Sequence, residues 1–313
     1  MNKYLPWIIF CLLIVQGCTN GSRRDHFLMT MPKETFKTSQ RYEKNHMGKE
    51  IQAPMFEHIK LVGNFDLRLT EDSYKSSVSI FGPKDQLGNI DIEVNGRSIE
   101  IKNLNKRVTS TIEVIVNTAE LEYIQFNGNG VVRNELLSNK SFDFDIETDG
   151  KVLINDQINV RYLQAGGTGK INFKKINSGY LSLTKLGSSS VELEGKVKLN
   201  FLEMRGGRLK VYWVESPLLR IIGKGSPFAE IAGVVDTLEI DLKDRARFNG
   251  KYLRVQKVYA KTYDYAHADI YAKEVRAAES FGKSNIYTHR NADLNSNYMA
   301  NQGVVLDVSE IES

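Results

Sequence analysis

The sequence predicts an all-β protein whose main part is a parallel β-solenoid, because one short apolar pattern repeats along most of the chain. Apolar residues recur every 18 to 20 positions in the series Ile124, Phe144, Leu163, Leu183, Phe201, Ile221, Ile240 and Val258. A second series follows the first after about 8 to 10 residues, at Val132, Val152, Ile171, Val191, Val211, Ile231, Phe248 and Ile270. Polar turns that usually contain glycine separate the two series, which keep step over seven intervals.

Each repeat is predicted to contain two short strands and two turns. The alternation of apolar and polar residues around Phe142, Phe144 and Ile146 has the two-residue period of a strand. A unit of this size cannot bury its apolar face alone, whereas stacked copies share a continuous core. We therefore expect a parallel β-helix of about eight or nine rungs over residues 120–290. A β-sandwich is the alternative, because regular short strands also fit that fold.

Residues 1–17 have the pattern of a secretory signal peptide. Lys3 gives a basic start, and the apolar run over residues 4–15 is too short to cross a bilayer. The run ends in the sequence VQGC, which resembles the bacterial lipobox, where the cysteine is lipidated and becomes the mature N-terminus. That cysteine is Cys18. A signal peptide cleaved nearby without lipidation is the alternative.

Cysteine usage favours lipidation at Cys18. The chain has two cysteines, and Cys11 lies inside the apolar run that would be removed. A single remaining cysteine cannot form an internal disulfide in an exported chain, so we expect acyl chains such as palmitate on Cys18. The membrane is then an expected partner. Because Thr19 and not aspartate follows the cysteine, the resemblance to bacterial lipoproteins implies the outer membrane of the cell envelope.

Residues 18–53 are predicted to form a flexible basic tether that begins at the lipidated cysteine. Between positions 19 and 53, seven Lys and Arg residues stand against four Asp and Glu residues, and 7 minus 4 gives +3. The segment has few apolar residues and no periodicity, a composition typical of disorder. The rest of the mature chain is close to neutral, so we expect no basic face for nucleic acid.

Residues 54–119 are predicted to form the N-terminal strand-and-hairpin opening of the solenoid. Two apolar strands are separated at Gly63 and Asn64, and further strands are expected near residues 78–81, 90–94, 99–101 and 112–116. The clearest hairpin signal is the pair Asn95 and Gly96, because this pair is flanked by the alternating segments IDIEV and RSIEI.

The same stretch resembles the opening of the GIN domain, described as the head domain of auto-transporter adhesins. That family begins with the pattern F-x-x-I-x-V-x-G-x-F-x-V and continues to a V-x-x-G-x-L-x-I hairpin. The matching positions are Phe56, Ile59, Leu61, Gly63, Phe65, Leu67, Val94, Gly96, Ile99 and Ile101. The resemblance extends over the rungs to about residue 290, although the turns depart from the family's frequent G-S-G-x. It implies a β-helical fold on an exported or anchored protein, an adhesin-like role and no catalytic residues.

Tyrosines concentrate in the last rungs, and residues 291–313 are predicted to cap the stack. A final strand at 304–308 would cover the last rung, whose free backbone groups could otherwise pair with other chains. Four tyrosines are candidate ligand-binding residues because aromatic rings can cover the apolar faces of sugars. They are Tyr259, Tyr263, Tyr265 and Tyr271. Packing by aromatic stacking is the alternative role of these rings.

One cluster of polar residues could support catalysis. Asp264 follows Asp244 at the interval of one repeat, and His267 follows Arg247 at the same interval, so stacked rungs would bring these four side chains together. Carboxylates beside an arginine and a histidine can bind a metal or transfer protons on a sugar. The repeat produces the same spacing in a solvated turn, so we expect no catalytic residues here.

The remaining signals predict neither a metal site nor a cofactor. The five histidines lack metal-ligand spacing, and the one mature cysteine is at the lipidation site. We therefore expect a lipid-anchored cell-envelope β-solenoid that acts by binding or scaffolding, without chemistry. A polysaccharide or an envelope or host protein is the expected partner. The alternatives are a polysaccharide-active β-helix enzyme, either a lyase or a hydrolase, and a structural component of an envelope protein assembly.

Overall fold

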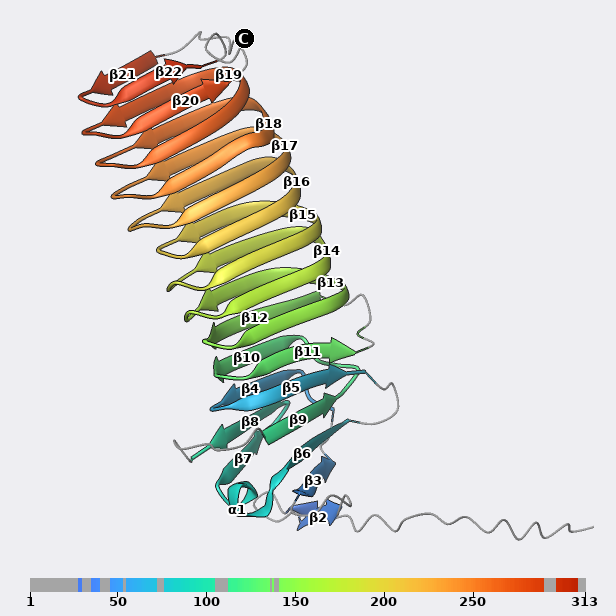
Figure 1. Cartoon of the computed structure of the whole chain (residues 1–313). Coiled ribbons are helices and arrows are strands. Elements are labelled where there is room, and N and C mark those ends of the chain that lie inside the picture. The colour runs from blue at the N-terminus through green and yellow to red at the C-terminus, as the bar shows by residue number, and fades with distance from the viewer. Residues whose placement is uncertain are drawn as a thin grey trace, which may run out of the picture.

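The computed structural model describes residues 28–29, 35–39, 46–52, 55–71, 76–104, 112–135, 137, 141–289 and 297–308. These residues form 22 strands and one short helix, α1 (Lys84–Leu87). Most of the strands run parallel to their neighbours in one long stack, which extends from the N-terminal end of the fold to the C-terminal end (Figure 1). The predicted parallel β-solenoid is confirmed, and the β-sandwich alternative is wrong.

Seven long strands each make most of one turn of the solenoid. They are β13 (Lys151–Gly166), β14 (Lys170–Lys185), β15 (Ser190–Met204), β16 (Arg208–Gly223), β17 (Phe228–Leu242), β18 (Arg247–Thr262) and β19 (His267–Phe281). The first part of each strand belongs to one parallel sheet, called sheet 2, and the last part belongs to another, called sheet 1. A broad bend, where the register shifts, joins the two parts, and a sharp turn leads to the next strand.

Shorter strands complete both sheets. Sheet 1 also contains β8 (Ser98–Asn103), β4 (His58–Val62), β10 (Tyr123–Gly128), β12 (Ser141–Thr148) and β21 (Asn297–Asn301). Sheet 2 also contains β9 (Ile112–Asn117), β5 (Phe65–Thr70), β11 (Val131–Glu135), β20 (Asn285–His289) and β22 (Val304–Asp307). From β11 through β13 to β20, sheet 2 passes through nine paired levels within residues 120–290, in agreement with the predicted eight or nine rungs.

The two apolar series are present in the structure. In the later repeats, however, each series passes from one ladder, a column of residues paired across successive strands, to another. In sheet 1, Leu183 stacks on Leu202 rather than on the predicted Phe201, and Ile240 stacks on Ala260 rather than on Val258. In sheet 2, Val191 stacks on Leu209, whereas Val211 belongs to the neighbouring inward ladder. Ala229, Ala260 and Ala268 occupy inward ladder positions. Where an alanine occupies the ladder position, the repeat predicted from the sequence instead includes a larger apolar residue nearby.

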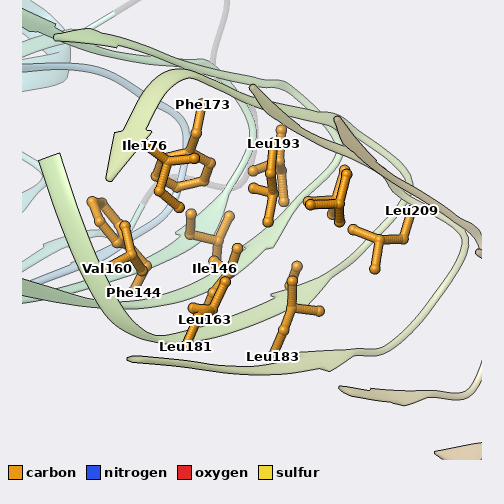
Figure 2. Packing of buried hydrophobic residues seen from close by; sticks show 14 of the residues in the cluster. Phe144, Ile146, Val160, Leu163, Phe173, Ile176, Leu181, Leu183, Leu193 and Leu209 are labelled. Carbon is orange, nitrogen blue, oxygen red and sulfur yellow. The ribbon is translucent and has the colours of Figure 1, made fainter. Parts of the chain in front are cut away.

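The core lies between the two sheets. Phe144 in sheet 1 makes an edge-on contact with Phe173 in sheet 2, with the ring centroids 5.2 Å apart. Figure 2 shows the side chains of the two sheets pointing toward one another at these levels. Both rings are fully buried, and burial of such large apolar side chains is the main favourable contribution to folding.

The N-terminal levels are not stacked in the order of the chain. Strands β4 and β5 form one level, and the chain then runs through β6 (Ser77–Pro83), α1 and β7 (Ile90–Asn95) to β8 and β9. Strands β8 and β9 pair with one side of the β4 and β5 level, whereas β10 and β11 pair with the other side. The predicted hairpin at Asn95 and Gly96 is present between β7 and β8, and Gly96 has the positive φ that its turn requires.

Antiparallel strands cover the N-terminal end of the stack. Strand β3 (His46–Gln52) pairs with β6, which pairs with β9, and Ile51 of β3 is buried. Strand β2 (Thr35–Ser39) pairs with β3, and β1 (Leu28–Met29) pairs with β2. Strand β3 lies within residues 18–53, for which a tether was predicted. Among the residues of β3 whose burial the structure describes, Ile51 is the one buried apolar side chain, and the sequence shows no alternating apolar pattern there. The predicted signal peptide and Cys18 lie outside the described residues.

The C-terminal end continues the parallel stack. Strand β21 pairs with β19, and β22 pairs with β20, so the final strands form one more level. Val304 and Leu306 of β22 are exposed at 43% and 42%. Residues 290–296 and 309–313, which also belong to the predicted cap, lie outside the described residues.

Candidate functional site

The sharp turns of the late levels contain two of the candidate catalytic residues, Asp244 and Asp264. Both have the left-handed backbone conformation, with φ of 60° and 61°, at a position where earlier turns have glycine. The Asp264 carboxylate accepts a hydrogen bond from the Asp244 backbone N–H at 3.1 Å, and the Asp244 carboxylate accepts one from Gly225 at 2.8 Å. Aspartate tolerates this conformation and pairs locally with backbone groups. The two carboxylates therefore stabilise consecutive turns.

His267, the candidate catalytic histidine, pairs with Asp269 rather than with Asp264. Its Nε2 lies 2.9 Å from Asp269 Oδ2, and Nε2 of His289 on the next level lies 3.3 Å from Asp269 Oδ1. Burial alone would raise the pKa of Asp269, but the hydrogen bond and charge of His267, the hydrogen bond of His289 and the charge of Lys251 hold that pKa below its ordinary value. The ring of Tyr287 packs edge-on against His267.

The four candidate catalytic residues therefore lie on neighbouring levels, but their side chains do not pair with one another as an acid and a base. Arg247 stacks directly below His267 in sheet 2, as the repeat interval predicted. The carboxylates of Asp244 and Asp264 are engaged with backbone N–H groups at the turn. Among the described residues, no group of three or more His, Cys, Asp or Glu residues is arranged to hold a metal ion.

The four predicted ligand-binding tyrosines occupy three different positions around the solenoid. Tyr259 lies in sheet 1, Tyr263 and Tyr265 lie in the sharp turn, and Tyr271 lies where β19 enters the broad bend. The Tyr263 ring stacks on Phe281, with centroids 5.0 Å apart, so one face of that ring is covered. These tyrosines do not form one continuous aromatic surface.

Tyr259 lies in a groove on the outer face of sheet 1, with a volume of about 310 Å³. In the outward ladder of this sheet, Tyr259 lies between Glu239 on β17 and Ala277 on β19. Ala277 has no side chain beyond its Cβ, so the neighbouring level leaves space beside the Tyr259 ring. The ring remains 44% exposed. An aromatic ring beside such a hollow can pack against an apolar surface of a ligand.

Charged residues border the groove on both sides. Arg220 continues the Tyr259 ladder and lies 3.9 Å from Glu239. The next outward ladder contains Asp241 and Lys261, and Lys261 forms a 3.0 Å ion pair with Glu279 on the following level. The hydrogen bond with the Glu279 carboxylate raises the pKa of Lys261. The groove thus combines one aromatic ring with hydrogen-bonding groups of both charges.

Sequence reasoning identified Tyr259 but missed the charged residues around it. Glu239 precedes Tyr259 by one repeat interval, and Arg220 precedes Glu239 by another. The outward positions of sheet 1, read at the same interval as the inward positions, would have shown this ladder. The two apolar series that predict the repeat face the core, so they do not include the outward positions of sheet 1.

Comparison with known proteins identifies a family and several structures of low similarity. The family described as "Putative auto-transporter adhesin, head GIN domain" matches residues 55–212. No curated protein matches the chain at a significant level. Within the described residues, α1 has only four residues, and no helix has the length and hydropathy of a membrane span.

Two crystal structures from Parabacteroides align with most of the chain at low similarity. One, described as a "putative lipid binding protein" from Parabacteroides distasonis, is 16% identical, with 84% of this chain and 97% of that chain covered and a TM-score of 0.46. A "putative adhesin" from Parabacteroides merdae is 18% identical, with 83% and 95% covered and a TM-score of 0.42.

The family match begins just before β4 and ends in the broad bend of β16, so it spans about half of the 313 residues. It includes the positions from Phe56 to Ile101 that carry the resemblance in the sequence. The rung pattern continues beyond the matched range to His289. The chain belongs to the GIN domain family and is an adhesin-like β-solenoid.

Proposed function

We propose that this protein is a lipid-anchored β-solenoid of the bacterial cell envelope that binds polysaccharide through the Tyr259 groove. The observation that carries the proposal is the exposed Tyr259 ring in a hollow on the outer face of sheet 1. The adhesin-like family supports a binding role at the cell envelope.

The groove suits a sugar ligand for two reasons. The face of an aromatic ring can pack against the apolar face of a sugar ring, and tyrosine adds a hydroxyl for hydrogen bonding. Glu239, Asp241 and Lys261 place acceptors and a donor beside that ring, where sugar hydroxyl groups need partners. Neighbouring levels of a sheet are about 4.8 Å apart, so an extended ligand can contact several levels.

The anchor in this proposal is Cys18, with acyl chains that hold the protein at the outer membrane. Its sequence context, VQGC followed by Thr19, supports this assignment. A lipoprotein carries several acyl chains, which gives more stable attachment than a single chain. The solenoid would then project from the membrane and offer the outer face of sheet 1 to a polysaccharide. The measurement is mass spectrometry of the mature N-terminus, with acylated Cys18 expected. An unmodified N-terminus at another residue would contradict this part of the proposal.

The binding function is tested by a screen of the purified protein against envelope and host polysaccharides. Retention and chain cleavage are recorded in the same samples. We expect retention of at least one polysaccharide without cleavage. Cleavage would contradict a binding role without chemistry and support the enzymatic alternative. An absence of retention across the panel would contradict polysaccharide binding and favour a protein partner.

A matched pair of variants then locates the binding site. Ala277→Leu fills the space beside Tyr259, and Ser182→Leu places the same side chain in the same outward ladder on β14. We expect Ala277→Leu to lose most of the retention and Ser182→Leu to keep it. Equal retention by both variants would contradict the assignment of the groove.

A further inference from the structure

A second hollow lies at the broad bend between β17, β18 and β19. Gly250 pairs with Ile270, and the next paired positions are Arg254 and Tyr271, so residues 251–253 of β18 have no counterpart on β19. Strand β19 therefore takes a shorter path around the bend than β18. The difference in path leaves a hollow of about 280 Å³ between levels. It is lined by Val234, Arg254, Val255, Gln256, Tyr271 and Lys273.

The two cations of this hollow, Arg254 and Lys273, have no acidic partner among the described residues. Within the part of the chain that the structure describes, neither Arg254 nor Lys273 lies within 4.0 Å of a carboxylate oxygen. Glu274, the acidic residue beside Lys273, forms a 2.7 Å ion pair with Arg276 instead. Asp236 is exposed on the preceding level and forms no ion pair among the described residues.

Two cations at the broad bend of earlier levels are paired. Lys174 of β14 forms an ion pair with Glu194 of β15. Lys196 of β15 lies 2.8 Å from Glu215 of β16. In both pairs the carboxylate lies on the following level. For Arg254, the paired position on the following level is Tyr271 and not an acidic residue.

We propose that this hollow binds the carboxylate or sulfate group of an acidic polysaccharide. An arginine guanidinium can donate two parallel hydrogen bonds to such a group, and a lysine ammonium adds a second positive charge. The Gln256 amide can donate a further hydrogen bond, and the Tyr271 ring offers a wall for the sugar that carries the charge.

The inference that the carboxylate or sulfate group belongs to a polysaccharide rests on the proposed function. The hollow lies on levels β17 to β19 and the Tyr259 groove on levels β16 to β19, so one extended chain of sugars could contact both. A hollow recessed between levels suits a single charged group on a flexible polymer better than a flat membrane surface.

The test compares two double variants that each remove two positive charges from the broad bend. Arg254→Gln with Lys273→Gln changes the hollow, and Lys174→Gln with Lys196→Gln is the matched control on earlier levels. Affinity for dextran sulfate and for polygalacturonate is measured by titration, with uncharged dextran as the reference polymer. We expect the hollow variant to lose at least tenfold in affinity for one or both charged polymers and the control to lose less than twofold. Equal losses, or no loss in either variant, would overturn the proposal.

Two further measurements distinguish this proposal from binding at the Tyr259 groove and from binding of a lipid headgroup. Tyr259→Ala is titrated with the same charged polymers, and a loss confined to the hollow variant supports the hollow even if the groove binds nothing. Vesicles containing phosphatidylglycerol are tested in parallel. If the hollow variant loses vesicle binding but keeps its affinity for both charged polymers, the polysaccharide assignment is overturned in favour of a lipid headgroup.

Discussion

The early and late levels of the solenoid differ in the residues that fill the core. In the early levels, Phe142, Phe144 and Phe173 lie inside the core. In the late levels, β17 to β19, Phe248 is the buried aromatic ring, alanines fill many inward positions, and Tyr252 and Tyr259 are exposed at 73% and 44%. Small residues thus replace most of the large core rings in the late levels, where two tyrosines face solvent.

This difference separates residues that hold the fold together from residues that are free to bind. A buried aromatic ring contributes to stability through the apolar area that it removes from water. An exposed ring contributes less to folding and remains accessible to a ligand. The family match ends at residue 212, so the groove and the hollow both lie beyond it. The early levels are the scaffold in this account, and the late levels are the binding region.

The largest expected effect on stability comes from the early core. Phe144→Ala removes a fully buried ring that contacts Phe173, so we expect the free energy of unfolding to fall by about 3–5 kcal/mol. Tyr259→Ala should change it by no more than about 0.5 kcal/mol, because this ring is exposed. Denaturant unfolding of both variants measures the difference. Similar losses in the two variants would remove the distinction between the regions.

The second prediction concerns Lys185, a fully buried lysine in the early levels. Its Nζ donates hydrogen bonds to the carbonyl oxygens of Leu186 and Gly187 at 3.0 and 3.1 Å. Burial lowers the pKa of Lys185 from 10.5 to about 8. Between these values the unfolded chain keeps the proton and the folded chain loses it. The free energy of unfolding should therefore rise by about 3 kcal/mol as the pH increases from about 8 to 10.5.

Lys185→Met is the control for this pH dependence, because methionine fills a similar volume without a titrating group. The difference in unfolding free energy between the original protein and the variant, measured across the same pH range, isolates the contribution of Lys185. We expect the variant to lack the rise. Parallel pH profiles of the original protein and the variant would contradict a lowered pKa for Lys185 in the folded protein.

A smaller effect is expected at the sharp turns, where glycine in the early levels is replaced by aspartate in the late levels. Asp264→Ala loses the hydrogen bond to the Asp244 N–H and keeps an unfavourable backbone conformation, so we expect a loss of about 1–2 kcal/mol. Asp264→Gly relieves the backbone and should lose less. Thermal unfolding compares the variants. A larger loss for glycine than for alanine would show that the left-handed conformation is not what selects aspartate.

The smallest effect on stability is expected at the rim of the groove. Arg220 and Glu239 are exposed and 3.9 Å apart, and such surface pairs contribute about 0–1 kcal/mol. Glu239→Gln should therefore leave the unfolding midpoint nearly unchanged while it weakens polysaccharide binding. The same denaturant and retention measurements test both statements. A clear loss of stability without a change in retention would assign this pair to the scaffold.

Much of the fold could be predicted from the sequence because the stacking of levels repeats a local pattern. Phe144, Leu163 and Leu183 stack as predicted, since the spacing between them follows from the length of one turn. The order of the N-terminal levels could not be predicted. Strands β8 and β9 reach the far side of β4 and β5 through pairings between distant segments, and local pattern carries no signal for them.

The candidate site could be predicted only in part. Tyr259 was among the predicted ligand-binding residues, and Asp244 and Asp264 stack as their spacing indicated. The hollow beside Arg254 could not be predicted, because it results from a difference in path between β18 and β19. The two strands have similar lengths in the sequence, so only the register of their pairing reveals that difference.

The most direct test of the account measures affinity and stability on one variant, Tyr259→Ala, with a polysaccharide that the original protein retains. Tyr180→Ala is the control, since Tyr180 is exposed at 56% on an earlier level. The account predicts at least a tenfold loss of affinity for Tyr259→Ala, no such loss for Tyr180→Ala, and an unchanged unfolding midpoint in both. Unchanged affinity together with a lowered midpoint for Tyr259→Ala would contradict the account, because the late tyrosine would then belong to the scaffold.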